Sequence, residues 1–380
     1  MAGKSSLFSW ASFAWAFPAV GGLMLLAPWL QVKANRIVEG TSRSLTFDDP
    51  IWGSVLLVFW VLPLLLALMG VPRRTVVRVA WAGFVILPCV LVSAAGAVAA
   101  PLSPPGSFAR VSPSWSFWFN LLGAYAGSVV LAPLTGFSRK WLSAAVGLFP
   151  LVLVLGLVTG AFSGLSLLKE YEAQGPVFWT QVQTHLILSG VAVATGAVLG
   201  TSLGWVAYRL DRFREPVFFF LNLIQTLPSL ALFGLLIVPL AALGLGGIGA
   251  TPALVALGLY AAFPVARSTL TALDHLDQAV LDAGRGLGMS RGQLFLRVQV
   301  PLALPVVLEG IRTASVQAVG NTVVAALIGA GGLGSLIFLG LGQYAPDLIL
   351  LGTLPVMALA LGLDQAWALV VGLFQRRVRT

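Results

Sequence analysis

Residues 184–208 read THLILSGVAVATGAVLGTSLGWVAY and contain no Asp, Glu, Lys or Arg. About 20 apolar residues in a helix cross the hydrocarbon core of a bilayer, so this run is long enough to span a membrane. Gly196, Gly200 and Gly204 recur every four residues and leave one face of that helix without side chains. Such a face lets the backbone of a second helix approach closely. The run therefore predicts a membrane-spanning helix with a close-packed face.

Apolar runs of similar length lie on both sides of this segment. The chain of 380 residues is 58% hydrophobic and 9% charged, whereas soluble domains are about 25% charged. Too few ionised groups remain to cover a soluble protein of this size, so the composition excludes that class. The first run is longer than the core of a signal peptide, which is roughly 7–15 residues, and is expected to be retained. We predict an all-α polytopic membrane protein with about ten spans, at residues 8–30, 51–71, 79–100, 115–136, 141–164, 184–208, 217–241, 251–270, 304–327 and 348–373.

Basic residues are distributed unevenly between the two sides of these predicted spans. If the amino terminus is cytoplasmic, 16 of the 22 Lys and Arg residues fall in inside segments and five in outside segments. The positive-inside rule then predicts that both termini are cytoplasmic. Lys33, Arg36 and Arg43 are exceptions, in the first outer loop. Because the net charge of +9 comes from small groups between apolar runs, the sequence predicts a lipid bilayer as partner and no nucleic acid.

One predicted cytoplasmic segment, residues 271–301, carries the densest charge in the chain and the pattern of two short helices. Residues 276–287 have apolar side chains at helical spacing, Gly288 can supply a positive-φ stop, and the sequence SRGQ at 290–293 forms a capping box for a second helix. Pro301 is expected to prevent that helix from continuing, because proline lacks a backbone donor. Two short helices joined at a glycine predict a compact docking knob. An amphipathic loop lying on lipid headgroups is the alternative.

The same segment carries a spaced motif. It reads Asp282-Ala283-Gly284, three residues, Gly288, nine residues and then VQVP, ending at Pro301. This pattern resembles the EAA signature of permease subunits of binding-protein-dependent ABC importers, whose form is Glu-Ala-Ala, three residues, Gly, nine residues and Ile-x-Leu-Pro. The spacing matches throughout. Asp282 replaces the Glu, Gly284 replaces the second Ala, and Val replaces both Ile and Leu, so the salt bridge to the ATPase that the family implies would start from a shorter side chain.

The resemblance implies a type I, MetI-like permease core at residues 176–380, with residues 271–301 as its ATPase-coupling loop. Residues 1–175 show no such match and are expected to form an accessory membrane region of about five helices. In the family, the loop inserts into a separate cytoplasmic ATPase that holds ATP and Mg, and closure of two ATPases rocks two permeases between inward-open and outward-open states. The implied partners are therefore that ATPase, an extracytoplasmic substrate-binding protein, and a second copy of this permease or a related one. The implied location is the bacterial cytoplasmic (inner) membrane, with no cofactor bound by this chain.

Within the motif, the small residues have expected roles. Gly288 should let the two short helices meet closely, and Ala283 and Gly284 should let a partner surface approach. Together with Asp282 and Pro301, these are the predicted ATPase-coupling residues.

Two further stretches resemble the osmoprotectant branch of the family, whose members import glycine betaine, choline, carnitine and related quaternary amines. They are NLIQTLPSLAL at 222–232 and ALIGAGGLG at 326–334. The resemblance implies the same substrate class, and an ABC permease for another small solute such as an amino acid is the alternative. A secondary transporter of amines, driven by Na⁺ or H⁺, is a further alternative. It would need carboxylates clustered at mid-membrane, and only Asp364 is well placed for that.

Some polar and kinked positions inside the predicted spans are candidates for the pathway or a gate. Pro228 frees a carbonyl that a hydroxyl, water or a substrate can satisfy, although a structural kink is the alternative. An unpaired ion at mid-membrane costs about 2.5–3.5 kcal/mol, so Arg312 and Asp364 are expected to face the bundle interior or to pair. Glu309 can meet Arg312 at a spacing of three residues, which leaves a structural ion pair and a gating role both open. The candidates are Gln225, Pro228, Ser229, Arg312 and Asp364.

The sequence has no pattern that predicts catalysis or metal binding. The lone Cys89 lies in an apolar run, which excludes a disulfide framework and a cysteine metal site. Gly3-Lys4-Ser5 lacks the upstream glycine of a P-loop, so the chain is expected to use an ATPase on another subunit. The Gly-x-Gly-x-x-Gly patterns that start at Gly244 and Gly329 do not join a strand to a helix and predict tight turns instead. An integral-membrane enzyme would need a nucleophile or ligand cluster that the sequence does not contain.

Overall fold

The computed structural model describes residues 21–35, 38–104, 106–138, 141–142, 145 and 147–379, and for 376–379 only the backbone. These residues form two compact units. We call Met1–Ala173 the N-terminal unit and Gln174–Thr380 the core unit. The predicted class, a helical membrane protein with several spans, is confirmed.

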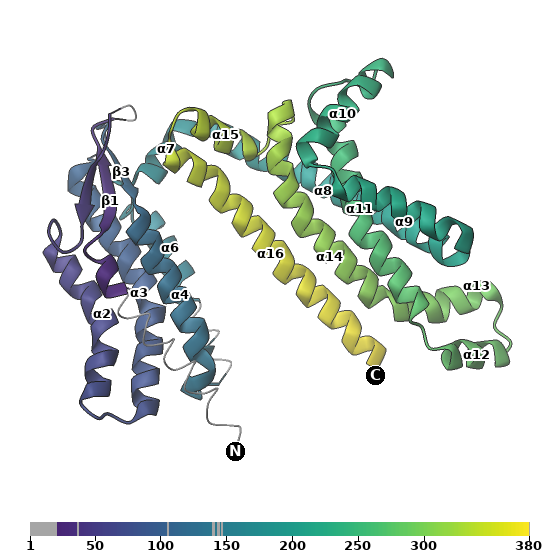
Figure 1. The fold of residues 1–380 in the computed structure, drawn as a ribbon, viewed down its shortest axis with the longest axis horizontal. Coiled ribbons are helices and arrows are strands. Elements are labelled where there is room, and N and C mark those ends of the chain that lie inside the picture. The colour runs from purple at the N-terminus through teal and green to yellow at the C-terminus, as the bar shows by residue number, and fades with distance from the viewer. Residues whose placement is uncertain are drawn as a thin grey trace. The chain divides into compact units, whose positions relative to one another are not determined.

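The N-terminal unit contains a small β-sheet as well as helices (Figure 1). Strand β1 (Pro28–Lys33) lies between β2 (Thr41–Ser44) and β3 (Arg110–Pro113), and both pairings are antiparallel. The sequence did not predict this sheet, whose three short strands lie in a predominantly helical chain. The predicted span 8–30 is wrong at its end, because Pro28 begins a strand whose Trp29 and Leu30 side chains are completely buried. The rest of that span, up to residue 20, lies outside the described residues.

Helices of the N-terminal unit pack around large aromatic side chains. The rings of Trp60 and Phe84 lie 5.2 Å apart, and the Trp60 indole donates a hydrogen bond to Asn120 Oδ1 at 3.0 Å. This bond satisfies the indole N–H and one side-chain oxygen that burial would otherwise leave without a partner. The helices are α2 (Pro50–Leu68), α3 (Arg73–Leu102), α4 (Trp115–Thr135), α6 (Leu148–Val158) and α7 (Ser166–Gln174).

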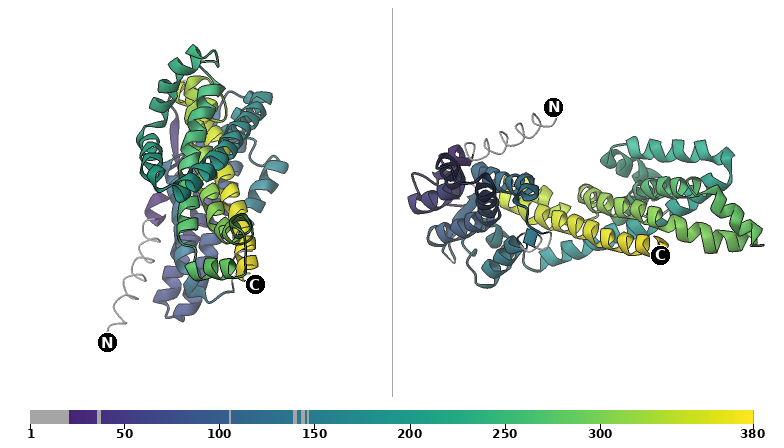
Figure 2. Two further views of the ribbon diagram at one scale, coloured as in Figure 1. Left: turned by 90° about the vertical axis from the view of Figure 1, so that its right-hand side faces the viewer. Right: turned by 90° about the horizontal axis from the view of Figure 1, so that it is seen from below.

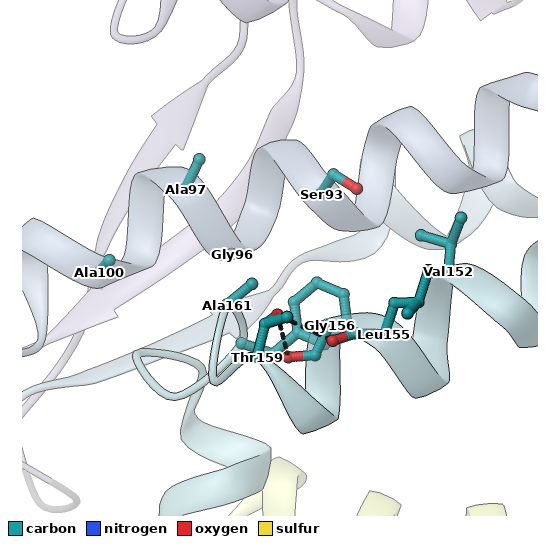
Figure 3. Close-up of a pocket in the computed structure, with 10 residues that line it drawn as sticks. Ser93, Gly96, Ala97, Ala100, Val152, Leu155, Gly156, Thr159 and Ala161 are labelled. Carbon is teal, nitrogen blue, oxygen red and sulfur yellow. Dashed lines mark hydrogen bonds between the residues drawn. The ribbon is translucent and has the colours of Figure 1, made fainter.

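A shallow apolar groove of 430 Å³ lies between α3 and α6 (Figure 3). Small residues line it, and Figure 3 shows Gly96 and Ala97 of α3 opposite Thr159 and its neighbours. The Thr159 hydroxyl donates to the Leu155 carbonyl at 2.8 Å. None of the ten residues that line the groove is charged. The groove therefore offers mainly packing surface, with the hydroxyls of Ser93 and Thr159 as the polar side-chain groups of its lining (Figure 3).

Long helices dominate the core unit, and α14 and α16 run side by side (Figures 1 and 2). The helices are α8 (Pro176–Arg209), α9 (Asp211–Thr226), α10 (Ser229–Ala242), α11 (Ala250–Asp274), α12 (Gln278–Gly286), α13 (Arg291–Leu294), α14 (Val300–Ala325), α15 (Gly334–Gly342) and α16 (Pro346–Arg379). A π-helical segment, η1 (Phe295–Gln299), joins α13 to α14, and a 3-10 turn, η2 (Ala326–Ile328), follows α14.

The glycine face of α8 packs directly against α11, as its spacing predicted. A Cβ atom on Gly196 would lie 2.4 Å from the Ala261 side chain, and one on Gly200 would lie 2.5 Å from the Ala262 carbonyl oxygen. Real Cβ atoms do not approach other atoms this closely, so neither position has room for a side chain. Close approach of the two backbones is therefore the basis of the core unit.

The number of spans differs from the prediction. In the described part of the chain, seven helices are long and apolar enough to cross a membrane, and the bent pair α9–α10 raises this to eight. The predicted count of about ten is not confirmed, because α6, the named helix among the described residues of 141–164, is only 11 residues long, and 8–30 lies mostly outside the described residues. The predicted span 217–241 is also not one straight helix, since α9 and α10 meet at an angle of 109°.

Candidate functional site

The charged segment predicted to dock a partner forms two short helices at one end of the core unit (Figure 1). We call α12, α13 and the turn between them, residues 278–294, the charged hairpin. Asp277 caps the start of α12, where its side chain accepts a hydrogen bond from the Ala279 N–H at 2.9 Å. Such a cap satisfies one of the free N–H groups at a helix start. The hairpin thus begins at a defined residue.

Local hydrogen bonds fix the turn of the charged hairpin. Gly288 has a φ of +79°, the Met289 N–H donates to the Gly284 carbonyl at 3.2 Å, and the Gly288 N–H donates to Arg285 at 2.9 Å. These two bonds and a left-handed glycine form a Schellman motif, which ends a helix. The predicted capping box then opens α13, with the Ser290 side chain and the Gln293 side chain each bonded to the other's backbone N–H. Both predicted stop and start signals are confirmed.

The surroundings of Gly284 and Gly288 contradict the roles that the sequence analysis predicted for these two glycines. A Cβ atom on Gly284 would lie 2.6 Å from Leu294 Cδ1, whereas Gly288 has no atom within 4 Å of such a position. Gly284 is therefore the residue that lets α12 and α13 meet closely, and Gly288 supplies only the turn. Gly284 is buried inside the hairpin, so it is not available to a partner surface. The expectation that it faces a partner was wrong.

Pro301 does not end the second helix. The helical path continues from Arg291 to Ile328, with Pro301 in the first turn of α14. In the preceding π-helical segment η1, the Val300 N–H donates to the Phe295 carbonyl, five residues back. This wider turn shifts the hydrogen-bond ladder just before the residue that cannot donate. The charged hairpin is consequently joined to a membrane-spanning helix without a flexible connection.

The base of the charged hairpin is fixed to neighbouring helices. Asp274, at the end of α11, forms a 2.6 Å ion pair with Arg214 of α9. Nearby, Leu273 packs with Ala303 of α14 in a buried apolar cluster that also includes Tyr208 of α8. Four membrane helices therefore meet where the hairpin leaves the bundle. The base of the hairpin is thus part of a closely packed junction.

One side of α12 presents apolar groups to solvent outside the predicted spans. Val280, Ala283 and Leu287 are exposed, and Leu287 is 79% exposed. Their spacing of three and four residues places them on one helix face. Asp282 lies beside this face and pairs with Arg285 at 2.6 Å. The sequence prediction named Ala283 and Asp282 but missed Val280 and Leu287, although the same helical spacing identifies them.

The predicted pathway residue Gln225 forms hydrogen bonds inside the bundle. Its side-chain N–H₂ donates to the Tyr260 carbonyl at 2.8 Å, and its side-chain oxygen accepts from Gln317 at 3.1 Å. Tyr260 precedes Pro264 by four residues, so its carbonyl is the one that lacks a helical donor. Gln225 supplies the missing donor and links α9, α11 and α14.

Pro228 and Ser229 lie at the bend between α9 and α10. The Leu227 carbonyl next to the bend accepts a hydrogen bond from the Tyr260 hydroxyl at 2.7 Å. Ser229 is the first residue of α10, and Pro228 immediately precedes it in an extended conformation. The 109° change of direction is therefore held by a side chain of α11. This bend explains why a single straight span was a wrong prediction.

Arg312 and Asp364 pair with each other across α14 and α16. Arg312 Nε and Nη2 donate to the two Asp364 carboxylate oxygens at 2.6 and 2.8 Å. The predicted contact with Glu309 is present as well, with one guanidinium nitrogen 3.4 Å from its carboxylate. A bidentate guanidinium–carboxylate pair is the stronger arrangement, so Asp364 is the main partner and Glu309 the weaker one. The sequence prediction expected both ions to face the bundle interior or to pair, and it did not identify Asp364 as the partner of Arg312.

The structure thus groups the predicted residues into three sets. The hairpin residues lie together at one end of the core unit, Gln225 lies with the bend at Pro228 and Ser229, and Arg312 lies with Asp364. Within the described residues, no group of three or more His, Cys, Asp and Glu side chains is arranged to hold a metal ion. The charged hairpin and its fixed base are the features that similar proteins help to interpret.

Two family models match this chain. Residues 196–380 match the binding-protein-dependent transport system inner membrane component family. Residues 12–168 match the N-terminal domain of the ABC transporter permease YehY. Most of residues 1–175, which do not share the resemblance to the permease core, therefore match a separate family model.

Several characterised permeases are similar to the core unit. A glycine betaine/carnitine/choline transport system permease protein, OpuCB of Bacillus subtilis, is 38% identical over 184 residues, which are 48% of this chain and 82% of that protein. An osmoprotectant import permease protein, OsmW of Salmonella typhimurium, is 43% identical over 180 residues, 47% of this chain and 83% of that protein. A structure of the MetNI methionine ABC transporter aligns with 52% of this chain and 98% of its own at 22% identity, with a TM-score of 0.48. The chain belongs to the binding-protein-dependent transport system inner membrane component family, the permease subunits of ABC importers.

Proposed function

We propose that this chain is the membrane-spanning permease of an importer for glycine betaine or related quaternary-amine osmoprotectants. OpuCB is named for glycine betaine, carnitine and choline, and OsmW for osmoprotectants. Both are more than 35% identical to the core unit over most of their own length. The proposed substrate class rests on this sequence similarity alone.

The proposal assigns ATP hydrolysis to a separate cytoplasmic subunit that binds ATP and Mg. In this scheme the charged hairpin docks on that subunit through Val280, Ala283 and Leu287, with Asp282 and Arg285 at the edge. The apolar stripe supports the assignment because an exposed apolar face on a structured element outside the membrane is typical of a protein interface. The continuous path from α13 into α14 supports it as well, since a rigid connection transmits motion where a flexible one would absorb it.

The proposal also includes the other partners of a binding-protein-dependent importer. An extracytoplasmic binding protein delivers the amine, and a second copy of this permease or a related one completes the pathway. Both termini are cytoplasmic in this scheme, which puts the charged hairpin and the Arg-rich end of α16 on the same side. The distribution of Lys and Arg between the predicted loops supports this orientation.

We further propose that Arg312 and Asp364 act in the pathway or its gate. Both side chains are partly exposed, at 28% and 29%, within helices that span the membrane. Glu309 is 45% exposed and adds a second carboxylate to one guanidinium. Charged groups at this depth generally face water or another charge and not lipid. A water-filled pathway between two permeases would provide that environment.

Uptake by the assembled transporter tests the function. The chain is expressed with its ATPase and binding protein, and accumulation of radiolabelled glycine betaine is measured in right-side-out vesicles that are loaded with ATP. We expect uptake to require ATP on the hairpin side and the binding protein on the other side. Uptake that persists without ATP and stops when an ionophore collapses the Na⁺ or H⁺ gradient would instead identify an ion-coupled secondary transporter. Uptake of an amino acid that glycine betaine and choline do not compete with would refute the substrate class.

A further inference from the structure

An apolar cavity of 510 Å³ lies in the core unit, beside the junction of η1 and α14. Residues of α8, α11, η1 and α14 line it, among them Thr201 and Trp205 of α8 and Val307 of α14. All of these residues lie in the part of each helix nearest the charged hairpin. The cavity is therefore at the same end of the membrane spans as the hairpin.

The cavity lining favours an apolar ligand. Two of its hydroxyl groups are used within their own helices, where Ser202 Oγ donates to the Val198 carbonyl at 2.7 Å and Thr269 Oγ1 donates to the Val265 carbonyl at 2.8 Å. None of the lining residues is charged. The Thr201 hydroxyl and the Trp205 indole N–H are the other polar side-chain groups of the lining, so a ligand that required many hydrogen bonds would lose more water contacts than it gained partners here. A hydrocarbon chain has no such cost.

The groups at the edge of the cavity have the order of a membrane interface. Trp205 and Phe295 both line it and contact each other edge to face, with ring centroids 6.3 Å apart. Tryptophan side chains are enriched at headgroup depth, which is the depth expected for Trp205. Arg209 follows Trp205 by one helical turn, on the same side of α8, and is exposed. A cation thus lies just beyond the apolar cavity, in the direction of the hairpin.

We propose that this cavity binds one acyl chain of an anionic phospholipid, whose phosphate pairs with Arg209. The apolar cavity, Trp205 and the Arg209 cation follow one another along the helix axis. This is the order in which the acyl chain, the interfacial region and the headgroup follow one another in a lipid. The site would place lipid against η1, the segment that joins the charged hairpin to α14. It does not depend on the substrate or on the partner ATPase, so its test is independent of the proposed function.

Photolabelling of the full chain tests the site. The protein is placed in vesicles of phosphatidylcholine that contain phosphatidylglycerol with a diazirine in its acyl chain, irradiated and mapped by peptide mass spectrometry. We expect labelling of residues 201–206 and 300–307 to exceed that of the exposed α16 residues Leu361 and Leu369 several-fold. Equal labelling of all three regions, or background labelling at the cavity because a second protein chain covers it, would overturn the proposal.

Two variants test the two parts of the site. Thr201→Phe fills the cavity and should remove the excess labelling, whereas Val191→Phe, a similar change at an exposed α8 position away from the cavity, should not. Arg209→Gln should lower phosphatidylglycerol labelling about fivefold, as expected for the loss of one cation near the surface, and lower the labelling by a diazirine phosphatidylcholine much less, because the choline ammonium neutralises the charge of its phosphate. Arg291→Gln is the matched control on α13. If Thr201→Phe retains the labelling, or Arg209→Gln affects both lipids equally, the assignment is wrong.

Discussion

Gly288 holds a backbone conformation that other residues adopt only with strain. Its φ is +79° and the space around it is open, so the requirement is conformational and not one of packing. A β-branched residue is rarely found at positive φ. The Schellman motif that ends α12 therefore depends on this residue.

We predict that Gly288→Val abolishes ATP-driven uptake while the protein stays in the membrane. The substitution would shift the turn and separate α12 from α13, so the hairpin could no longer act as a rigid body. Gly286→Ala is the matched control, because Gly286 is helical and equally open. Uptake and membrane content are measured for both variants, and uptake at the wild-type rate in Gly288→Val would refute a coupling role for the hairpin.

Gln225 compensates for a proline on another helix. Its side chain bonds to the Tyr260 carbonyl, which Pro264 leaves without a helical donor. We predict that Gln225→Leu destabilises the folded protein by about 1–3 kcal/mol, the usual cost of an unsatisfied buried polar group. Thermal unfolding in detergent measures the loss as a lower midpoint.

A second substitution separates this explanation from a pathway role. Pro264→Ala restores a backbone N–H four residues after Tyr260, so Gln225→Leu should cost much less in that background. A transport defect that remains in the double variant at normal stability would indicate that Gln225 also acts in the pathway. If Gln225→Leu has the same effect on stability in both backgrounds, the compensation argument fails.

At the scale of secondary-structure elements, the α8–α11 contact holds the core unit together. A side chain at Gly200 would meet backbone atoms of α11, which cannot move away cheaply. We predict that Gly200→Leu destabilises the core by about 1–3 kcal/mol or more, as overpacking does. Gly190→Leu on the same helix should have little effect because Gly190 has open space around it. Similar unfolding midpoints for the two variants would contradict this packing.

The ion pair between α14 and α16 gives a second prediction at this scale. Arg312→Gln should lower the midpoint of unfolding, because it leaves the carboxylates of Asp364 and Glu309 without the cation that pairs with them. The exchanged variant Arg312→Asp with Asp364→Arg should restore the midpoint of unfolding. If it also restores uptake, the pair is structural. Recovery of stability without uptake would support the proposed gating role, since charge position would then matter.

At the scale of the whole molecule, the two units have separate relatives. The match to OpuCB covers 82% of that protein but 48% of this chain, so such a permease has little room for the N-terminal unit. We predict that residues 174–380, expressed with an initiating methionine, insert in the membrane and support ATP-dependent uptake with the same partners. Membrane content and uptake are measured against the full chain. A well-inserted core that binds the ATPase but does not transport would assign an essential role to the N-terminal unit.

The sequence alone determined the features that depend on near neighbours in the chain. Most membrane helices were predicted from apolar runs, because a bilayer requires that length and composition from each segment separately. The Gly288 turn and the Ser290 capping box were predicted for the same reason, as their hydrogen bonds connect residues only a few positions apart. The family followed from a spaced motif that is 20 residues long, from Asp282 to Pro301, and overlaps this hairpin.

Only the tertiary structure determined which distant residues meet. Arg312 and Asp364 are 52 residues apart in the sequence, and Gln225 and Tyr260 are 35 residues apart. Strand β1 pairs with β3 although α2 and α3 separate them in the sequence. Such contacts depend on how far each helix is rotated and shifted against its neighbour, and an apolar run carries almost no information on either. The close contact at Gly284 and the unbroken helix through Pro301 have the same origin, because surrounding packing and a π-helical turn decide them and not local preference.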